Sequence, residues 1–338
     1  MSDTSSAAPA ADLTGRAAMR PMPKEGEGGL FSQSWFPVGF SSEVAPSQVT
    51  GFPYLDGRIV VVRSSSGELS ALSAYCPHMG ADLAVGAVIE DTLRCPFHHW
   101  RYSFGGQCVA TAVGDPAPPA ARLFRYPVQE KFGLIWVFNG EKPLYQLPDF
   151  PFPHSELVIR TLALPDTMPV DPWVLCCNTP DLQHIKALHS VQFDMKDPHD
   201  DVEWSEYSML YDFRGFHKNG EAIDNRIGIF GTTLYYQSTV FADKWFGFMT
   251  PFAMPAPGHT RTYMIVAARR DMGSAQEIEQ YLDFVEQLER GVVSEDEMIM
   301  RTVHFAPSHL TRSDRTLAKF LDYLRSYPRA HPGARFIR

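Results

Sequence analysis

The sequence has little of several features, and each shortage excludes a class of protein. Five cysteines are too few and too unevenly placed for a disulfide framework in 338 residues. A formal net charge of −9 gives no basic surface for nucleic acid or for a membrane. No apolar run could span a bilayer, and the N-terminus has no apolar signal core. We therefore expect a cytoplasmic protein that binds neither nucleic acid nor membrane.

The common motifs of several enzyme classes are also missing. No Gly-x-Gly-x-x-Gly or Gly-x4-Gly-Lys-Ser/Thr pattern occurs, so nothing indicates a nicotinamide, flavin or nucleotide site. No Gly-x-Ser-x-Gly elbow or Ser-x-x-Lys pair indicates a hydrolase. With 44% hydrophobic and 20% charged residues, the composition is that of a globular protein long enough for two domains.

The first half of the chain predicts a mobile tail and a β domain. Residues 1–30 are rich in Ser, Ala, Pro and Gly and show little apolar periodicity, which is typical of a mobile tail. Across residues 31–150, short β-like runs alternate with turn residues, which favours an antiparallel β domain. The predicted strands are 36–40, 58–63, 69–75, 93–95, 123–128 and 133–139.

Residues 151–338 predict an α+β domain. Helix-like spacing at 172–188 is followed by runs that are typical of antiparallel strands, and two amphipathic patterns near the C-terminal end predict helices. The predicted strands are 204–216, 227–240, 245–251 and 261–269, and the predicted late helices are 276–300 and 315–327.

Two histidines and an aspartate stand close together in residues 181–189. His184 and His189 do not share a face of a regular α-helix, so one metal ion could bind both only if the helix is broken or bulged. Asp181 and His184 are three residues apart, which would allow a hydrogen bond that fixes the imidazole tautomer. Taken alone, such a segment is more often a solvated helix edge.

Two pairs of metal-ligating residues stand in predicted loops of the β domain. Cys76 and His78 form Cys-x-His, and after sixteen intervening residues Cys95 and His98 form Cys-x2-His. By ligand type alone, a Cys2His2 zinc site would be a fair hypothesis. The spacing, however, resembles the Rieske [2Fe-2S] motif, in which two Cys bind one iron and two His the other. The resemblance extends to Pro77, Pro96, Gly80 and the segments 100–102 and 106–108.

Two residues near this motif need a separate interpretation. Rieske oxygenases usually have Gly after the second histidine, whereas His99 stands here, so His99 is the alternative to His98 as a ligand. Cys108 lies beyond the loop, and we expect it to be a buried small apolar residue.

With a Rieske-like domain before it, the second segment resembles the iron segment of the Rieske non-haem iron oxygenases. The matching pattern is Asn178-x2-Asp181-x2-His184-x4-His189. In this family two imidazoles and one carboxylate bind Fe2+ on one face and leave the opposite positions open to O2. The carboxylate comes from a late helix, and the resemblance implies Asp296, with Glu295 and Glu297 as alternatives.

The resemblance also implies roles for two neighbouring polar residues. The family's subunits assemble head to tail as homotrimers, so that a Rieske domain abuts the catalytic domain of the next chain. Asp181 would then bridge His78 or His98 of one subunit and His184 of the next. Asn178, one helical turn before Asp181, either approaches the open side of the iron or caps a broken helix, and the structural role is slightly favoured.

The fold and activity that the resemblance implies are those of a terminal oxygenase. Residues 31–150 would form an antiparallel β Rieske domain, and residues 151–338 a catalytic domain with a helix-grip-like antiparallel sheet and helices. The cofactors would be a [2Fe-2S] cluster and Fe2+, with O2 as co-substrate. Electrons from NAD(P)H would arrive only through a separate flavin or iron-sulfur reductase or a ferredoxin.

The compact length resembles members that hydroxylate or that remove O- or N-methyl groups from an aromatic or polycyclic small molecule. Aromatic cis-dihydroxylation and aliphatic C–H hydroxylation of an alkaloid are the alternatives. By strand position, we predict a pocket lined by Phe193, Phe230, Tyr235, Trp245, Phe248 and Phe252. Cationic anchors for a carboxylate or sulfonate could be Lys218, Arg226 or the pair Arg269 and Arg270, although each is more often a surface charge.

Two other classes compete with this hypothesis. A pure Rieske electron carrier would hold only the cluster, and it would leave the second domain and residues 181–189 without a role. A structural zinc protein with an unrelated binding domain would be colourless and loaded with zinc.

Overall fold

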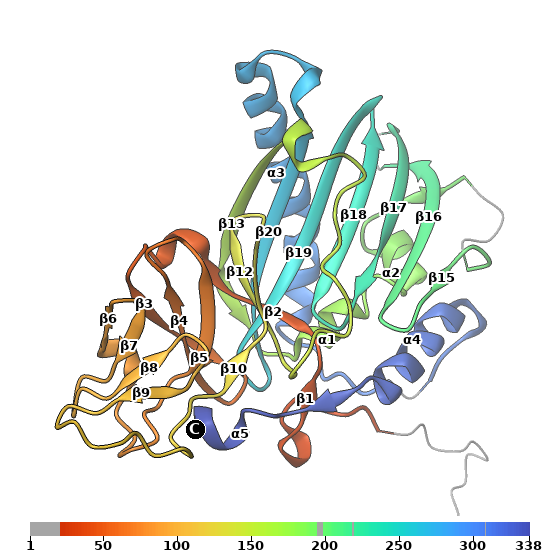
Figure 1. The fold of residues 1–338 in the computed structure, drawn as a ribbon. Helices are drawn as coiled ribbons and strands as arrows, with labels where there is room; N and C mark the ends of the chain where they lie inside the picture. Colours follow the sequence, from red (N-terminus) through yellow and green to blue (C-terminus); the bar gives the residue numbers. More distant parts are fainter. Residues whose placement is uncertain (1–20, 195–198, 218–219, 308) are drawn as a thin grey trace, which may run out of the picture.

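The structure is a computed structural model that describes residues 21–194, 199–217, 220–307 and 309–338. Figure 1 shows a smaller β lobe and a larger lobe in which a long helix lies across a broad sheet. None of the helices in these ranges is long and apolar enough to cross a membrane.

The first lobe consists of small antiparallel sheets, as the alternation of short apolar runs and turns predicted. In β4 (Gly57–Arg63) four consecutive residues, 59–62, are fully buried, which suits their β-branched side chains. One sheet has the order β10-β5-β4-β3, with β3 (Val49–Tyr54), β5 (Leu69–Ser73) and β10 (Arg125–Tyr126). The second has the order β11-β12-β2, with β2 (Trp35–Phe40), β11 (Val128–Lys131) and β12 (Leu134–Phe138). The third has the order β6-β7-β8-β9, with β6 (Ala87–Ile89), β7 (Thr92–Arg94), β8 (Arg101–Ser103) and β9 (Cys108–Ala110).

The second lobe contains one eight-stranded antiparallel sheet in the order β13-β20-β19-β18-β17-β16-β14, with β15 paired to β16. The strands are β13 (Leu157–Met168), β14 (Gln192–Phe193), β15 (Glu203–Trp204), β16 (Ser208–Phe216), β17 (Ala222–Phe230), β18 (Leu234–Phe241), β19 (Lys244–Ala256) and β20 (His259–Arg269). The predicted strand at 227–240 is two strands, because Gly231, at φ +61°, begins a hairpin turn. β13 was not predicted.

The long helix α3 (Ala275–Met300) covers this sheet. Ser274 accepts a hydrogen bond from the Glu277 N–H, and Glu277 accepts one from the Ser274 N–H, so a capping box starts the helix. Its buried residues Ile278, Leu282 and Val285 join the hydrophobic cluster of the sheet. Each such side chain contributes roughly 1.5–3 kcal/mol relative to an exposed position.

The other helices are short. They are α1 (Pro172–Cys176), α2 (Leu182–Ala187), α4 (Arg315–Ser326) and α5 (Ala334–Ile337), with 3-10 turns at Glu27–Gly29, Ser41–Glu43, Leu83–Val85, His154–Glu156, Arg270–Met272 and Arg312–Asp314. The predicted helix at 172–188 is interrupted between α1 and α2, where Pro180 cannot donate a helical hydrogen bond. The predicted α+β class, with an antiparallel β first domain and a sheet-rich second domain, is confirmed.

Residues 25–32 pack against the C-terminal segment, so the tail predicted for residues 1–30 is too long. Glu25 is buried, its carboxylate accepts a hydrogen bond from the Ser32 N–H, and it pairs with Arg329. β1 (Phe31–Ser32) pairs with β21 (Arg329–Ala330). Ile337 lies fully buried in the core of the first lobe. The last residues therefore pack on the first lobe, and the boundary at residue 150 stays a prediction.

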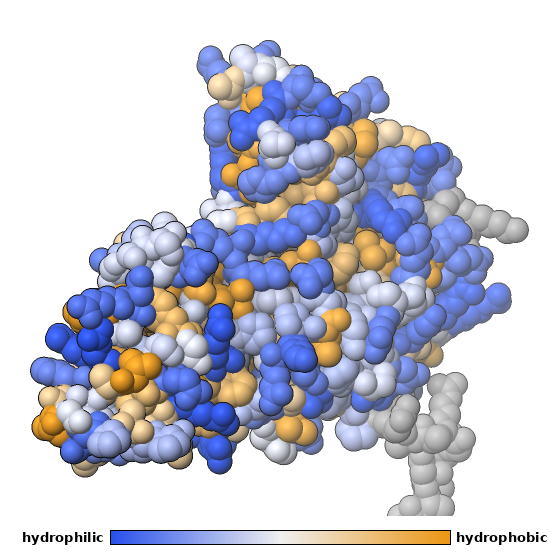
Figure 2. Space-filling view, in the orientation of Figure 1, coloured by the Kyte–Doolittle hydropathy of each residue, from blue (hydrophilic) through white to orange (hydrophobic). Residues whose placement is uncertain are grey.

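The loops that carry Cys76, His78, Cys95 and His98 adjoin β6, β7 and β8, at the end of the first lobe away from the broad sheet (Figure 1). Figure 2 shows hydrophobic atoms on the surface of this end. The exposed large apolar residues in and beside these loops are Met79, Val85, Phe97, Val109 and Val113.

Candidate metal centres

Local backbone bonding shapes the two loops of the first lobe. The Gly80 N–H donates to the Cys76 carbonyl oxygen (2.8 Å), and the Cys95 N–H donates to the Trp100 carbonyl oxygen (2.8 Å). Gly80 has φ +77°, in the left-handed region that favours glycine. Each loop is thus closed by a backbone hydrogen bond within six residues, which keeps its Cys and His close together in space.

His99 also has a left-handed backbone, with φ +54°. This conformation gives a physical reason for the glycine that is usual at this position in Rieske oxygenases, because glycine adopts it without steric cost. The His99 side chain is exposed, whereas His98 is half-buried beside His78, with ring centroids 4.7 Å apart. The geometry therefore favours His98 over His99 as the partner of His78.

The two cysteines lie inside the loops and the two histidines lie nearer the surface. Cys76 and Cys95 are buried, whereas His78 is exposed and stacks on Trp100 with ring centroids 4.3 Å apart. Tyr102 places its hydroxyl 3.0 Å from Cys76 Sγ. Burial raises the pKa of the Cys76 thiol, with the nearby Cys95 acting in the same direction, so a thiolate there requires a cation.

A single zinc ion would draw all four donor atoms around one point, at about 2.0–2.3 Å from each. Within the described residues, the only three His, Cys, Asp or Glu side chains with donor atoms all within 4.8 Å of one another are His184, His189 and Asp296. The two loops therefore hold the two thiols away from the two imidazoles. That spread fits a two-iron cluster, with thiolates on one iron and imidazoles on the other.

Cys108, which lies beyond the cluster motif, is half-buried at the start of β9 and packs against the apolar cluster beneath these loops. It is less buried than the sequence predicted.

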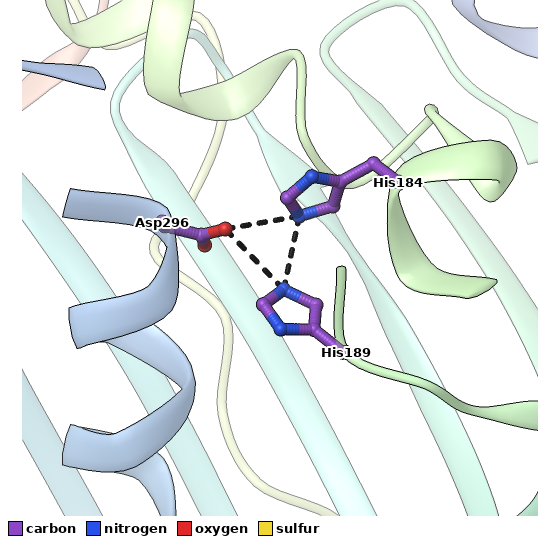
Figure 3. A group of neighbouring side chains, drawn as sticks. All are labelled: His184, His189 and Asp296. Atoms are coloured by element: carbon purple, nitrogen blue, oxygen red, sulfur yellow. Dashed lines mark hydrogen bonds and ion pairs between the residues drawn. The ribbon is translucent and has the colours of Figure 1, made fainter. Parts of the chain in front are cut away.

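His184, His189 and Asp296 meet at one point, where their donor atoms face inward (Figure 3). The two Nε2 atoms are 2.9 Å apart, and Asp296 Oδ1 lies 3.0 Å from His184 Nε2 and 3.3 Å from His189 Nε2. The imidazole planes are nearly perpendicular, at 88°. Two ligand atoms bound at right angles, about 2.1 Å from one metal ion, would lie about 3.0 Å apart. The triangle thus has the size of one face of an octahedron.

The Asp296 carboxylate supplies a further test of fit to a cation. Its Oδ1 is buried and, despite its distances to the two imidazoles, has no well-directed hydrogen bond. An unsatisfied buried carboxylate oxygen is costly unless a cation or a donor compensates it. The ion pairs with His184 and His189 hold the pKa of Asp296 to about 2 although its burial opposes this, so the donor is a carboxylate at neutral pH.

His184 and His189 reach one point because α2 ends between them, as their five-residue spacing requires. α2 stops at Ala187, and Ser190 has φ +58°, so the chain turns sharply around His189. Asp181 is the N-cap of α2: its Oδ1 accepts a hydrogen bond from the His184 backbone N–H (3.0 Å). The hydrogen bond predicted from Asp181 to the His184 ring is therefore replaced by one to the backbone.

The two acidic neighbours of Asp296 have other partners. Glu295 Oε2 lies 2.9 Å from His189 Nδ1, which leaves His189 Nε2 directed at the triangle. Glu297 pairs with Arg301. Burial opposes protonation of His189, but the hydrogen bonds and charges of Asp296 and Glu295 outweigh it and raise the pKa of this imidazole. The geometry thus favours Asp296 over both alternatives as the third donor.

Asn178 lies in the turn between α1 and α2 and lines the adjacent cavity. The helix cap at this break is Asp181, so the capping role that the sequence slightly favoured for Asn178 is wrong. Its carbonyl oxygen accepts a hydrogen bond from the Asp181 N–H (3.3 Å).

A cavity of about 400 Å³ lies beside the triangle, between α2, α3 and the sheet. Its volume is in the range of small-molecule sites, roughly 300–1,000 Å³. Tyr235, Phe248 and Phe252 line it, as we expected from the sequence. Phe230 and Trp245 were wrongly predicted: they alternate with cavity-facing residues along their strands and pack in the cluster on the other face of the sheet.

Phe193 is also outside the lining. It packs edge-on against Phe213, which does line the cavity, with ring centroids 5.0 Å apart.

The predicted cationic anchors do not reach the cavity. Arg226 points away from it and pairs with Glu203 and Asp212. Arg269 pairs with Asp271, and Arg270 donates to the Ser155 carbonyl oxygen. Lys218 lies outside the described residues. Among the residues that the structure describes, no lysine or arginine lines the cavity, so the prediction of an anion anchor at these arginines is wrong.

Sequence reasoning missed the polar side of the cavity, formed by Asn225, Gln237, Thr239 and Glu289. A signal was available. Asn225 alternates with the apolar residues Ile223 and Ile227, and Glu289 lies one turn after Val285 in the apolar stripe of α3. Polar residues at positions that should face a core indicate a polar interior.

The loops with the Cys and His pairs and the His184 region lie at opposite sides of the molecule in Figure 1, where β6 to β9 are far from α2. Within one chain, the two centres are thus well separated.

Sequence similarity to known proteins lies mainly in the first domain. Residues 34–127 match the Rieske [2Fe-2S] domain family. The chain is 39% identical over 124 residues to cholesterol 7-desaturase nvd 1 of Ciona intestinalis, covering 36% of this chain and 26% of that protein. It is 33% identical over 129 residues to the 5,5'-dehydrodivanillate O-demethylase oxygenase subunit of Sphingobium sp. (strain NBRC 103272 / SYK-6), covering 36% and 30%. The chain thus spans under a third of either relative.

The similarity in fold includes both lobes. The crystal structure of dicamba monooxygenase bound to dicamba matches with a TM-score of 0.66 over 87% of this chain and 97% of that chain, at 19% identity. The chain therefore contains a Rieske [2Fe-2S] domain, and its two-lobed fold is similar to that of a monooxygenase of known structure.

Proposed function

We propose that this protein is a terminal oxygenase that uses O2 to hydroxylate or O-/N-demethylate an aromatic or polycyclic small molecule. The observation that carries the proposal is the triangle of His184, His189 and Asp296 beside a cavity of about 400 Å³. Two imidazoles and one carboxylate on a single face are the donor set of non-haem Fe(II) oxygenases. The Rieske domain in the same chain also supports the proposal, because its [2Fe-2S] cluster could deliver electrons to the iron.

In this proposal, Cys76, His78, Cys95 and His98 hold a [2Fe-2S] cluster, and His184, His189 and Asp296 hold Fe2+. When bound, the cluster supplies one-electron transfer and the Fe2+ supplies a place to activate O2 reductively. The inward-facing donor atoms and the unsatisfied Asp296 oxygen support the iron assignment.

The residues around the iron ligands have defined tasks. Glu295 fixes the tautomer of His189, so that its Nε2 lone pair faces the metal position. The cap at Asp181 sets the start of α2 and thereby the position of His184. Phe248 and Phe252 form part of an apolar wall that excludes water from the reacting substrate.

Electrons come from a partner protein. We infer a flavin or iron-sulfur reductase or a ferredoxin as donor, because the sequence has no nicotinamide or flavin motif of its own. The wide separation of the two centres within one chain supports transfer between subunits of a homotrimer, in which Asp181, bonded to the His184 backbone N–H, would contact His78 or His98 of a neighbour. The exposed apolar residues around the cluster loops support a protein partner at that end.

The test is product formation with a surrogate reductase and NADH on a panel of methoxy-, N-methyl- and sulfonated aromatics. We expect hydroxylation or loss of a methyl group as formaldehyde from at least one neutral or basic compound. Sulfonated compounds should react poorly, since no cationic side chain lines the described cavity. A cis-dihydrodiol as the main product would contradict the proposed outcome in favour of dihydroxylation.

A second candidate is aliphatic C–H hydroxylation of an alkaloid. The observation that favours it is the buried acidic residue Glu289 in the cavity wall, since alkaloids carry a basic nitrogen.

A further inference from the structure

A chain of hydrogen-bonded polar side chains crosses one wall of the cavity. Tyr235, Gln237 and Thr239 project from β18, Asn225 from the neighbouring β17, and Glu289 from α3, which covers the sheet. Asn225, Gln237, Thr239 and Glu289 are all less than a tenth exposed. Polar groups at such depth usually serve structure or recognition, because burying them costs free energy.

The hydrogen bonds of this wall determine which groups remain for a ligand. Gln237 Oε1 accepts from the Tyr235 hydroxyl (2.7 Å), and Gln237 Nε2 donates to Thr239 Oγ1 (2.9 Å) and to Glu289 Oε1 (3.0 Å). The Thr239 hydroxyl then donates to Asn225 Oδ1. Both amide hydrogens and the amide oxygen of Gln237 are thus used, which fixes its orientation.

Glu289 has one oxygen left over. Its Oε1 accepts from Gln237, whereas Oε2 has no hydrogen-bond partner among the residues that the structure describes. The residue lines the cavity, with 5% of its surface exposed. Its free oxygen is an acceptor, so a ligand that pairs with it must bring a donor.

Little positive charge surrounds Glu289 within the part of the chain that the structure describes. No lysine or arginine of the described chain lines the cavity, and two of its three histidines are the proposed iron ligands. Burial raises the pKa of Glu289 to about 7, although the Gln237 hydrogen bond and the charge of His189 act in the opposite direction. An ionised carboxylate in this position is therefore poorly stabilised until a cation arrives.

We propose that Glu289 is a specificity residue that binds a basic nitrogen of the substrate, so that the enzyme acts on a small amine or N-heterocyclic base. The proposal rests on the proposed oxygenase function for the oxidation itself. It replaces the anion anchors that the sequence suggested with an anchor of opposite charge.

The position of Glu289 also sets where the nitrogen sits relative to the oxidised carbon. Glu289 and Asp296 are seven residues apart on α3, which is two turns along the same helix face and about 10 Å along the axis. Val292 and Val293 lie between them in the cavity lining. The substrate is thus expected to hold its basic nitrogen at one end and the carbon to be oxidised at the other, across an apolar centre.

The experiment measures binding to the oxidised holoenzyme by isothermal titration, with neither reductase nor turnover. Three probes share one ring system: 2-naphthylmethylamine, 2-naphthylmethanol and 2-naphthoate. We expect the wild type to bind the amine about 10- to 100-fold more tightly than the alcohol, as a hydrogen bond to a charged group would give, and the acid most weakly.

Three variants test whether Glu289 causes this preference. Glu289→Gln should reduce the preference for the amine over the alcohol to a few-fold or less, and Glu289→Asp should keep part of it. Glu286→Gln is the matched control: it lies on the same helix, but pairs with Arg160 and Arg290 outside the cavity. It should leave the preference unchanged. Melting temperature and iron content of each variant show whether it is folded and loaded.

Two results would overturn the proposal. One is a wild type that binds the alcohol as tightly as the amine. The other is a folded, iron-loaded Glu289→Gln variant that keeps the full preference, as it would if the amine bound to iron directly. Because binding is measured without turnover, a protein that prefers amines but oxidises none would refute the proposed oxygenase function and not the role of Glu289.

Discussion

The two proposed metal centres are built in different ways. The four cluster ligands lie within residues 76–98, on two loops that close through their own backbone hydrogen bonds. The iron triangle joins α2 and the turn after it to Asp296 on α3, more than a hundred residues later. Its geometry therefore depends on how α3 packs across the sheet.

Because they are built differently, the two centres should tolerate different changes. The cluster loops extend from one end of the molecule, so their ligands are set by local turns and by a few neighbours such as Tyr102 and Trp100. The triangle lies against the cavity, where Glu289 and Asp296 share one face of α3. A change in the substrate pocket can thus disturb the iron position, whereas it should leave the cluster unchanged.

Removing one iron ligand should have the largest effect, and it should affect only one of the two centres. We expect His189→Ala to lose the mononuclear iron and to reduce turnover by more than the roughly 10- to 100-fold that outer-shell changes typically cost. The visible spectrum of the cluster should stay unchanged. Product formation and absorbance are the measurements, and His154→Ala, which replaces an exposed histidine that belongs to neither centre, is the control. Retained turnover in His189→Ala would rule out this ligand.

The proposed link between the centres is tested by Asp181→Asn. Asparagine caps helices about as well as aspartate, so α2 should start normally while the negative charge is lost. We expect the cluster to keep its spectrum and the rate of its oxidation by O2 and substrate to fall roughly 10- to 100-fold. Stopped-flow absorbance measures this rate, and a near-normal rate would refute the bridge.

Glu295→Gln should have a smaller effect on iron binding, and the direction of this effect should depend on pH. At high pH, loss of the carboxylate that orients His189 should weaken iron binding by about tenfold. In acid, protonated His189 competes with iron, and the raised pKa of this histidine makes wild-type iron loss begin above its ordinary value of 6.5. Without the Glu295 charge that pKa falls, so acid loss should shift to lower pH.

Iron retained after dialysis against a chelator across a pH series measures both effects. An unchanged pH profile would contradict the proposed role of Glu295.

Tyr102→Phe should have the smallest effect and should affect only the cluster. When Cys76 is a thiolate ligand, the Tyr102 hydroxyl must donate to its sulfur, which stabilises the reduced cluster more than the oxidised one. Loss of a hydrogen bond worth about 1 kcal/mol corresponds to a potential lower by about 40 mV for one electron. A spectroscopic redox titration measures it, and a potential that rises would contradict this assignment.

The same contrast explains how much the sequence could predict. The cluster motif is local, so its ligands could be read from spacing and neighbours. α3 and α4 could be predicted within a residue or two, since amphipathic periodicity persists along them. The break between His184 and His189 followed from their five-residue spacing, because both could reach one ion only outside a regular helix.

The pocket could be predicted only in part, because its lining depends on which face of each strand is turned inward. A one-residue error in strand position exchanges the two faces. The unrecognised turn at Gly231 hid the start of β18, and Phe230 and Trp245 were assigned to the wrong face. Glu289 was missed because a glutamate on an amphipathic helix is usually solvated, although its position one turn after Val285 places it in the apolar stripe of α3.

The most direct test of the central claim is an iron count with Mössbauer spectroscopy on the wild type and on Asp296→Ala. The claim that the chain holds a cluster and a separate mononuclear site predicts about three irons per wild-type chain, two of them in a [2Fe-2S] cluster. Asp296→Ala should lose only the mononuclear iron signal. A wild type with two irons, or an Asp296→Ala variant that keeps all three, would contradict the account.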